Sequence, residues 1–172
     1  MYIPILLGTA REGRQSEKVA NFMLGEVKKA GHTSEIIDVR DYRIPATDNT
    51  EKSSLAKKLE SKIVPADALI IVSPEYNHGY PGELKMALDL LWKQYTKKPV
   101  GFCGVSSGLM GGGRAVEQLR LVSIQLRMIP ILQALYFPMV QNLFDEKGEI
   151  KDESYHKRVE SFLENLVSYV KK

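Results

Sequence analysis

Residues 6–24, LLGTAREGRQSEKVANFML, decide the fold class because they join a strand to a helix through a short polar loop. The apolar run at 2–8 predicts the strand, and an apolar face within residues 16–29 predicts the helix. The same alternation continues along the chain. Further strands are predicted at 34–39, 66–74, 98–107 and 129–138, and further helices at 51–63, 81–95, 111–127 and from 153 onward. Such alternation is typical of an α/β fold with helices on both faces of a parallel sheet.

Composition and length set the broad class. The chain has 172 residues, 44% hydrophobic and 26% charged, which indicates one globular domain spanning residues 1–172. No apolar run approaches the roughly 20 residues of a membrane span, and we expect no signal peptide at the start. A net charge of +3 is too small to indicate nucleic-acid binding. The single cysteine, Cys103, permits no disulfide within the chain and fits a cytoplasmic location.

The first polar loop resembles a phosphate site without matching a known one. Gly8 and Gly13 have the spacing of G-x-x-x-x-G-K-[ST], but Arg14 and Gln15 replace the lysine and the hydroxyl of a nucleoside-triphosphate loop. We predict that Ser16 caps the following helix, whose N–H groups then suit the phosphate of a monoester. The alternative is a capped helix start whose arginines are simply solvated.

Two more loops have unusual chemistry, and both follow predicted strands. Residues 73–83, SPEYNHGYPGE, follow the third strand, and residues 106–114, SSGLMGGGR, follow the fourth. In a sheet of order 2-1-3-4-5, strand order reverses between strands one and three, and ligands bind at the carboxyl ends there. Gly79 and Gly82 would let the backbone approach a flat ligand, and Asn77 could bond to its oxygens. Each loop could instead be an ordinary turn.

These segments together resemble the NADPH-dependent FMN reductase family of flavodoxin-like proteins. The resemblance runs from the first strand to the fourth helix, and PEYNHGYPGELKMALD, residues 74–89, is its most specific part. Gly8, Thr9 and Arg11 follow the family pattern G-[ST]-x-R. Extra residues separate Arg11 from Ser16, and we therefore expect Arg14 to point to solvent. The resemblance implies a flavodoxin-like three-layer sandwich with a five-stranded parallel sheet.

The resemblance also implies the roles of individual residues. Thr9, Arg11 and Ser16 would hold the FMN phosphate, helped by backbone N–H groups near Glu17 and Lys18. The isoalloxazine and ribityl groups would lie between the loops after the third and fourth strands. Their contacts would come from Pro74, Glu75, Tyr76, Asn77, Ser106, Ser107 and Gly108.

The implied activity is reduction of a small acceptor by NADPH or NADH through bound FMN. Hydride would pass from the nicotinamide to flavin N5, after which an oxidant enters the same site. The acceptor could be a quinone, free flavin, an azo compound or a metal oxyanion. No side chain is needed as acid, base or nucleophile, so we name no catalytic residue. The alternatives are a flavodoxin-type electron carrier, whose class is more acidic and lacks the loop arginine, and a protein that keeps the fold but binds no flavin. An esterase-like hydrolase is a further alternative, but the sequence contains no G-x-S-x-G motif, which argues against it.

The remaining features concern metal binding and assembly. His32, His78 and His156 lack metal-ligand spacing, so we predict no metal site, with His78 in a solvent-facing loop and His156 on the surface of the last helix. We predict that Cys103 is a small residue of the hydrophobic core. Apolar residues surround the helix at 81–95 almost completely. The next helix has a second apolar face formed by Leu121, Ile124 and Met128. These faces predict a homodimer or a homotetramer.

Overall fold

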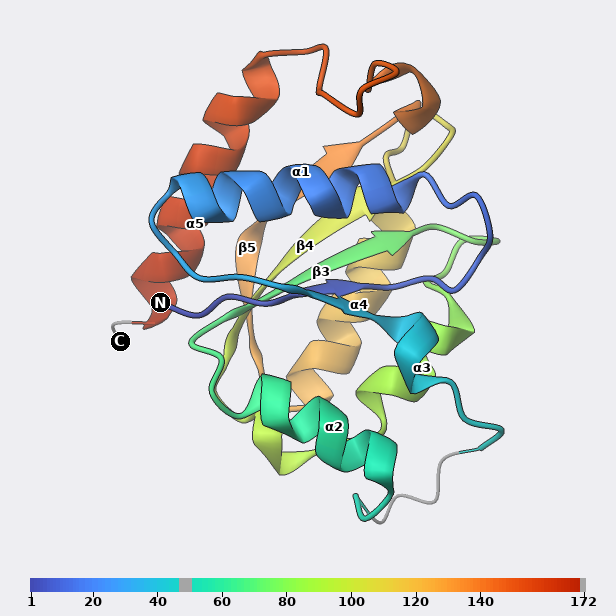
Figure 1. Cartoon of the computed structure of the whole chain (residues 1–172), viewed down its shortest axis with the longest axis vertical. Coiled ribbons are helices and arrows are strands. Elements are labelled where there is room, and N and C mark those ends of the chain that lie inside the picture. The colour runs from blue at the N-terminus through green and yellow to red at the C-terminus, as the bar shows by residue number, and fades with distance from the viewer. Residues whose placement is uncertain (47–50, 171–172) are drawn as a thin grey trace.

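The computed structural model describes residues 1–46 and 51–170 (Figure 1). Within these residues a five-stranded parallel sheet has the order β2-β1-β3-β4-β5, as predicted. The strands are β1 (Ile5–Leu7), β2 (Ile36–Asp38), β3 (Leu69–Pro74), β4 (Pro99–Val105) and β5 (Ile129–Phe137). The helices are α1 (Ser16–Lys29), α2 (Ser54–Ile63), α3 (Gly82–Leu88), α4 (Gly113–Gln125) and α5 (Ser154–Val170).

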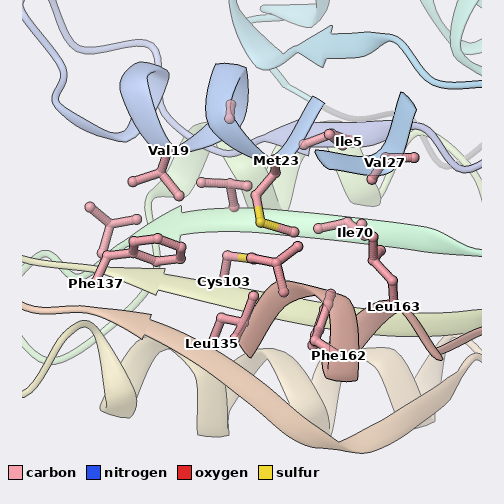
Figure 2. Close-up of a cluster of buried hydrophobic side chains, with 14 of the residues drawn as sticks. Ile5, Val19, Met23, Val27, Ile70, Cys103, Leu135, Phe137, Phe162 and Leu163 are labelled. Carbon is pink, nitrogen blue, oxygen red and sulfur yellow. The ribbon is translucent and has the colours of Figure 1, made fainter. Parts of the chain in front are cut away.

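Helices cover both faces of the sheet, so the strands are buried on both sides. Helices α1 and α5 lie on one face, and α2, α3 and α4 lie on the other (Figure 1). Figure 2 shows side chains of α1 and α5, among them Met23 and Phe162, meeting strand residues between the layers. Cys103 is fully buried there, as predicted, and burial raises the pKa of its thiol. None of the helices in the described ranges combines the length and apolar character that crossing a membrane requires.

The helix predicted at 81–95 is shorter than its sequence pattern indicates. Helix α3 ends at Leu88, and the chain continues through tighter turns, including a short 3-10 helix at Lys93–Tyr95. These turns direct Leu90, Leu91 and Tyr95 inward, where all three are buried. Burial of these side chains outweighs the propensity to continue the helix. The apolar ring around this segment is therefore mostly core, and the prediction of a second free face on it is wrong.

Other boundaries differ in smaller ways. Helix α2 begins at Ser54 rather than 51, because the Ser53 side chain accepts a hydrogen bond from the Ala56 N–H at 3.0 Å and caps the helix. A short 3-10 helix, Val39–Tyr42, follows β2 directly and lies between the second predicted strand and the second predicted helix. Met128 is buried rather than on the second face of α4.

Candidate functional site

The loop after β1 begins at Gly8, whose backbone packs closely against β3 and α3. A Cβ atom on Gly8 would lie 2.9 Å from Leu84 Cδ2 and 3.0 Å from the Val72 carbonyl oxygen, so a larger residue there would displace Leu84 and crowd the backbone of β3. The Gly8 N–H donates to that same carbonyl at 2.9 Å. Gly13 then takes a φ of +63°, which returns the chain toward α1. The loop thus lies close over the carboxyl end of β3.

Ser16 is the first residue of α1 and not its cap, so the predicted cap is wrong. Gln15 occupies the cap position and its side chain makes no capping bond. The Ser16 hydroxyl is buried without a hydrogen-bond partner, although the residue lines a cavity. The first N–H groups of any α-helix also have no partner within the helix. The Lys18 N–H, however, already donates to the Gln15 carbonyl oxygen at 3.1 Å, so the N–H groups that precede it are the ones open to a ligand. A buried hydroxyl beside open N–H groups at one helix start suits a phosphate.

Arg14 is buried and does not point to solvent, contrary to the sequence prediction. Its side chain is 1% exposed, and Nη1 donates to the Thr9 carbonyl oxygen at 2.5 Å. Nη1 and Nη2 also donate to the two carboxylate oxygens of Asp38, at 2.8 and 2.5 Å. Burial alone would raise the pKa of Asp38, but hydrogen bonds from Arg14 and Arg40 hold that pKa well below its usual range.

Thr9 connects the loop after β1 to the loop after β3. Its Oγ1 lies 2.8 Å from the Tyr76 hydroxyl, close enough for a hydrogen bond in either direction, and accepts a bond from the Arg11 N–H at 3.3 Å. The Arg11 guanidinium is exposed and lies over the Tyr76 ring, 5.8 Å from its centroid. Arg11 is therefore the arginine of this loop whose charge faces the open side of the site.

The loop after β3 forms a tight turn anchored on α4. The backbone groups of Tyr76 and Gly79 bond to each other at 2.8 and 3.0 Å. Asn77 and His78 take positive φ angles of 50° and 69°, so these two residues, and not the glycines, make the reversal. The Glu75 carboxylate accepts bonds from the backbone and side chain of Arg114 at 3.1 and 2.9 Å. Glu75 therefore holds the loop against α4.

The loop after β4 packs closely over its own strand. Gly111 and Gly112 have positive φ angles, and a Cβ on Gly104 would lie 2.5 Å from the Gly111 carbonyl oxygen. Closer to the strand, the Ser106 hydroxyl donates to the Gly108 carbonyl at 2.9 Å. That carbonyl also accepts a bond from the Met139 N–H at 3.1 Å, which ties the loop to the segment after β5.

A cavity of about 340 Å³ joins these loops at the carboxyl ends of the strands. Its lining includes the predicted residues Arg11, Ser16, Pro74, Glu75, Tyr76, Ser106 and Ser107. Thr9 is buried beside it, while Glu17, Lys18, Asn77 and Gly108 do not line it. Sequence reasoning missed Glu12, Gly13, Arg14, Gln15, Val105 and Val140. Val140 follows β5. Because β5 is the neighbour of β4 in the predicted strand order, the segment after β5 could have been expected beside the loop after β4.

The three histidines lie away from this cavity's lining. His78 is exposed in its loop, as predicted, and its carbonyl accepts a bond from Gln118 Nε2 at 2.8 Å. His156 is only partly exposed, because its ring packs edge-on against Phe22 with centroids 5.3 Å apart. It borders a larger recess of about 690 Å³ between α1 and α5, which has none of the loop residues described above.

The sheet order and the cavity at the strand-order reversal define a flavodoxin-like fold with a ligand site at the carboxyl ends of its strands. The family model of NADPH-dependent FMN reductase matches residues 1–142, and this chain belongs to that family. It is accordingly an oxidoreductase that works with FMN and NAD(P)H. These findings do not favour the alternative of an electron carrier without nicotinamide oxidation.

Individual relatives agree with this assignment. The chain is 31% identical to an NAD(P)H-dependent FMN reductase of Schizosaccharomyces pombe, over 86% of this chain and 80% of that protein. It is 27% identical to an FMN-dependent NADPH-azoreductase of Staphylococcus saprophyticus, over 97% and 94%. Among solved structures, the flavoenzyme NAD(P)H:acceptor oxidoreductase FerB of Paracoccus denitrificans has the same fold. It gives a TM-score of 0.84 at 20% identity and covers 99% of this chain and 97% of its own.

Proposed function

We propose that FMN binds in the cavity at the strand ends with its phosphate at the start of α1. The unpartnered buried hydroxyl of Ser16 carries this proposal, because a phosphate oxygen would satisfy it. Arg11 supplies the free positive charge, and the start of α1 near Glu17 adds the positive end of the helix dipole. The predicted Lys18 N–H contributes no free donor there, because it bonds to the Gln15 carbonyl oxygen. Thr9 supports the loop through its contacts with Tyr76 and the Arg11 N–H.

The flavin ring and ribityl chain then lie between residues 74–77 and 106–108. When bound, FMN supplies the chemistry of accepting hydride from a nicotinamide and passing electrons on. The protein residues bind and orient the reactants, and none is required as an acid or base. The Glu75–Arg114 ion pair holds one wall of the cavity on α4, and the bond between the Met139 N–H and the Gly108 carbonyl holds the other on the segment after β5.

The acceptor that fits best is a flat aromatic molecule such as a quinone or an azo compound. Three exposed apolar side chains lie close to lining residues of the cavity in the sequence: Leu109 and Met110 in the loop after β4, and Met139 directly before Val140. They would contact an aromatic ring favourably and would give a metal oxyanion no charge partner. Relatives carry compatible names: a 2-hydroxy-1,4-benzoquinone reductase of Burkholderia sp is 27% identical over 98% of this chain and 96% of its own.

Direct reduction of bound flavin by a nicotinamide tests this function. Mixing the FMN-loaded protein with NADPH or NADH in a stopped-flow instrument should bleach the flavin absorbance, and a quinone added afterwards should restore it. Bleaching by neither nicotinamide within seconds, together with rapid bleaching by a partner reductase, would identify an electron carrier. A chromate oxyanion serves as the matched acceptor, and we expect it to restore the absorbance more slowly than the quinone.

We further propose that the working form is a homodimer or homotetramer assembled on α4. Leu121 and Ile124 are 70% and 60% exposed on this helix. Leu132 on β5 is 85% exposed close by, since Arg120 of α4 donates to its carbonyl oxygen at 2.7 Å. An apolar patch of this kind on neighbouring elements favours a subunit contact. The apolar residues predicted to form a second face at 81–95 give no support to this assembly, because most of them are buried in the core.

Charged substitutions on α4 test the assembly. Leu121→Glu with Ile124→Lys should give monomers by light scattering while keeping the far-ultraviolet helix signal, because both side chains leave the core untouched. Lys157→Glu with Glu160→Lys, at exposed positions of α5 on the other face of the sheet, is the matched control, because it too leaves the net charge unchanged, and it should leave the molar mass unchanged. A monomeric wild-type protein at micromolar concentration with full activity would contradict the proposal.

We also propose that residues 1–172 act as one FMN-binding domain in the cytoplasm. Both hydrophobic clusters of the described residues pack on the same sheet, which supports a single folding unit. The lone cysteine is buried rather than available for a disulfide, which supports a reducing compartment.

A further inference from the structure

The buried guanidinium of Arg14 lies where the ends of β1 and β2 meet, and the proposed FMN contacts give it no role. Asp38 is the last residue of β2 and receives two hydrogen bonds from Arg14. Thr9 follows β1, and its carbonyl oxygen receives a third. A buried arginine that bridges two strand ends in this way fixes the path of the loop between them.

The charge of Arg14 is already balanced by carboxylates. Asp38 accepts both arms of its guanidinium, and Glu17 lies 3.4 Å from its Nε. The same two carboxylates pair with the exposed Arg40, at 2.9 and 3.6 Å. Two arginines and two carboxylates therefore form a network of no net charge, and Arg14 has no free charge with which to attract a phosphate dianion.

Contacts continue from this network into the proposed flavin site. Arg14 holds the Thr9 carbonyl, and the Thr9 hydroxyl meets the Tyr76 hydroxyl at 2.8 Å. Arg11 lies over the ring of the same tyrosine. The chain of contacts from Asp38 to Tyr76 thus crosses the carboxyl ends of β2, β1 and β3, which are neighbours in the sheet.

We propose that Arg14 and Asp38 are a positioning pair that sets the shape of the phosphate loop and thereby the preference for FMN over riboflavin. Arg14 acts through the backbone of Thr9, whereas Arg11 acts by charge. This inference rests on the proposed placement of the FMN phosphate at Arg11 and Ser16. It makes a prediction opposite in sign to that of simple electrostatics, because Asp38 is negative and yet should favour binding of an anion.

The test compares Asp38→Asn with Arg40→Ala in the full chain freed of flavin, by fluorescence titration with FMN and with riboflavin. Asp38→Asn removes a negative charge, so charge alone predicts tighter FMN binding. A positioning role predicts a loss of roughly tenfold or more for FMN, with little change for riboflavin. Arg40→Ala removes a positive charge from the exposed side of the same carboxylate. Charge alone predicts weaker FMN binding by this variant, whereas positioning by Arg14 predicts almost no change in FMN affinity.

Arg14→Lys is the second variant, because it keeps the charge and loses the two-armed contact with Asp38. We expect the same selective loss for FMN, and the unchanged riboflavin affinity reports that the variants fold. If Asp38→Asn and Arg14→Lys bind FMN as tightly as wild type or more tightly, the inference is overturned. Equal losses of affinity for FMN and riboflavin in these two variants would also overturn it. Ser16→Ala and Arg11→Ala separate the two proposals. If they leave FMN affinity unchanged, the phosphate placement itself fails. If they weaken FMN while Arg14→Lys does not, only the positioning role fails.

Discussion

Arg11→Ala should weaken FMN binding by roughly ten- to hundredfold and leave riboflavin binding almost unchanged. Arg11 is exposed over the Tyr76 ring at the mouth of the cavity, and its charge is the one that the loop leaves available to a phosphate. A hydrogen bond to a charged group contributes about 1.5–3 kcal/mol, which corresponds to that range of affinity. Riboflavin lacks the phosphate, so it loses only the packing of the arginine stem. Titration of the flavin-free protein with each ligand measures both affinities.

Arg127→Ala is a matched control for this experiment. It removes the same charge at the opposite end of the sheet, just before β5 begins, where Arg127 is exposed. The net charge of the protein changes equally in the two variants, so a long-range effect would weaken FMN in both. Equal losses for FMN and riboflavin in Arg11→Ala would show that this arginine does not recognise the phosphate. Raising the salt concentration should also weaken FMN less in Arg11→Ala than in wild type, because screening acts on the charge that is missing.

The fold was predictable because its determinants are local and repeated. Strands buried on both faces read as continuous apolar runs, and each was followed by an amphipathic helix, so order and layers followed from general rules. The positions of the ligand loops followed from the reversal of strand order between β1 and β3. Seven of the residues expected at the flavin line one cavity for this reason.

The errors arose where a residue's environment depends on distant parts of the chain. Arg14 was expected in solvent because its partner Asp38 is 24 residues away and belongs to another strand. The helix at 81–95 was expected to continue because its composition favours a helix, but the core takes up Leu90 and Leu91 only if the chain turns. Ser16 was expected to cap a helix beginning at residue 17. Helix α1 begins at Ser16 itself, so the serine makes no capping bond and its hydroxyl is left for a ligand.

Gly104→Ala should destabilise the protein and weaken FMN binding together, since β4 and the loop that follows it share one close contact. The added methyl would lie 2.5 Å from the Gly111 carbonyl oxygen and 3.0 Å from Val116 Cγ2. Backbone atoms cannot move aside as a flexible side chain does, so the loop at 106–113 must shift as a unit. Overpacking of this kind costs about 1–3 kcal/mol in the free energy of unfolding. Urea denaturation measures that cost, and flavin titration reports the displaced loop.

Two glycine variants make the comparison specific. Gly108→Ala lies in the same loop and Gly25→Ala lies on the exposed side of α1, and at both positions an added Cβ meets no atom within 4 Å. Gly25→Ala should raise the free energy of unfolding by about 0.5–1 kcal/mol, because alanine loses less conformational entropy in a helix. Gly108→Ala should leave stability close to wild type. Unfolding of Gly104→Ala at the wild-type urea midpoint would mean that the loop after β4 shifts without cost, which would contradict the close packing of that loop on its strand.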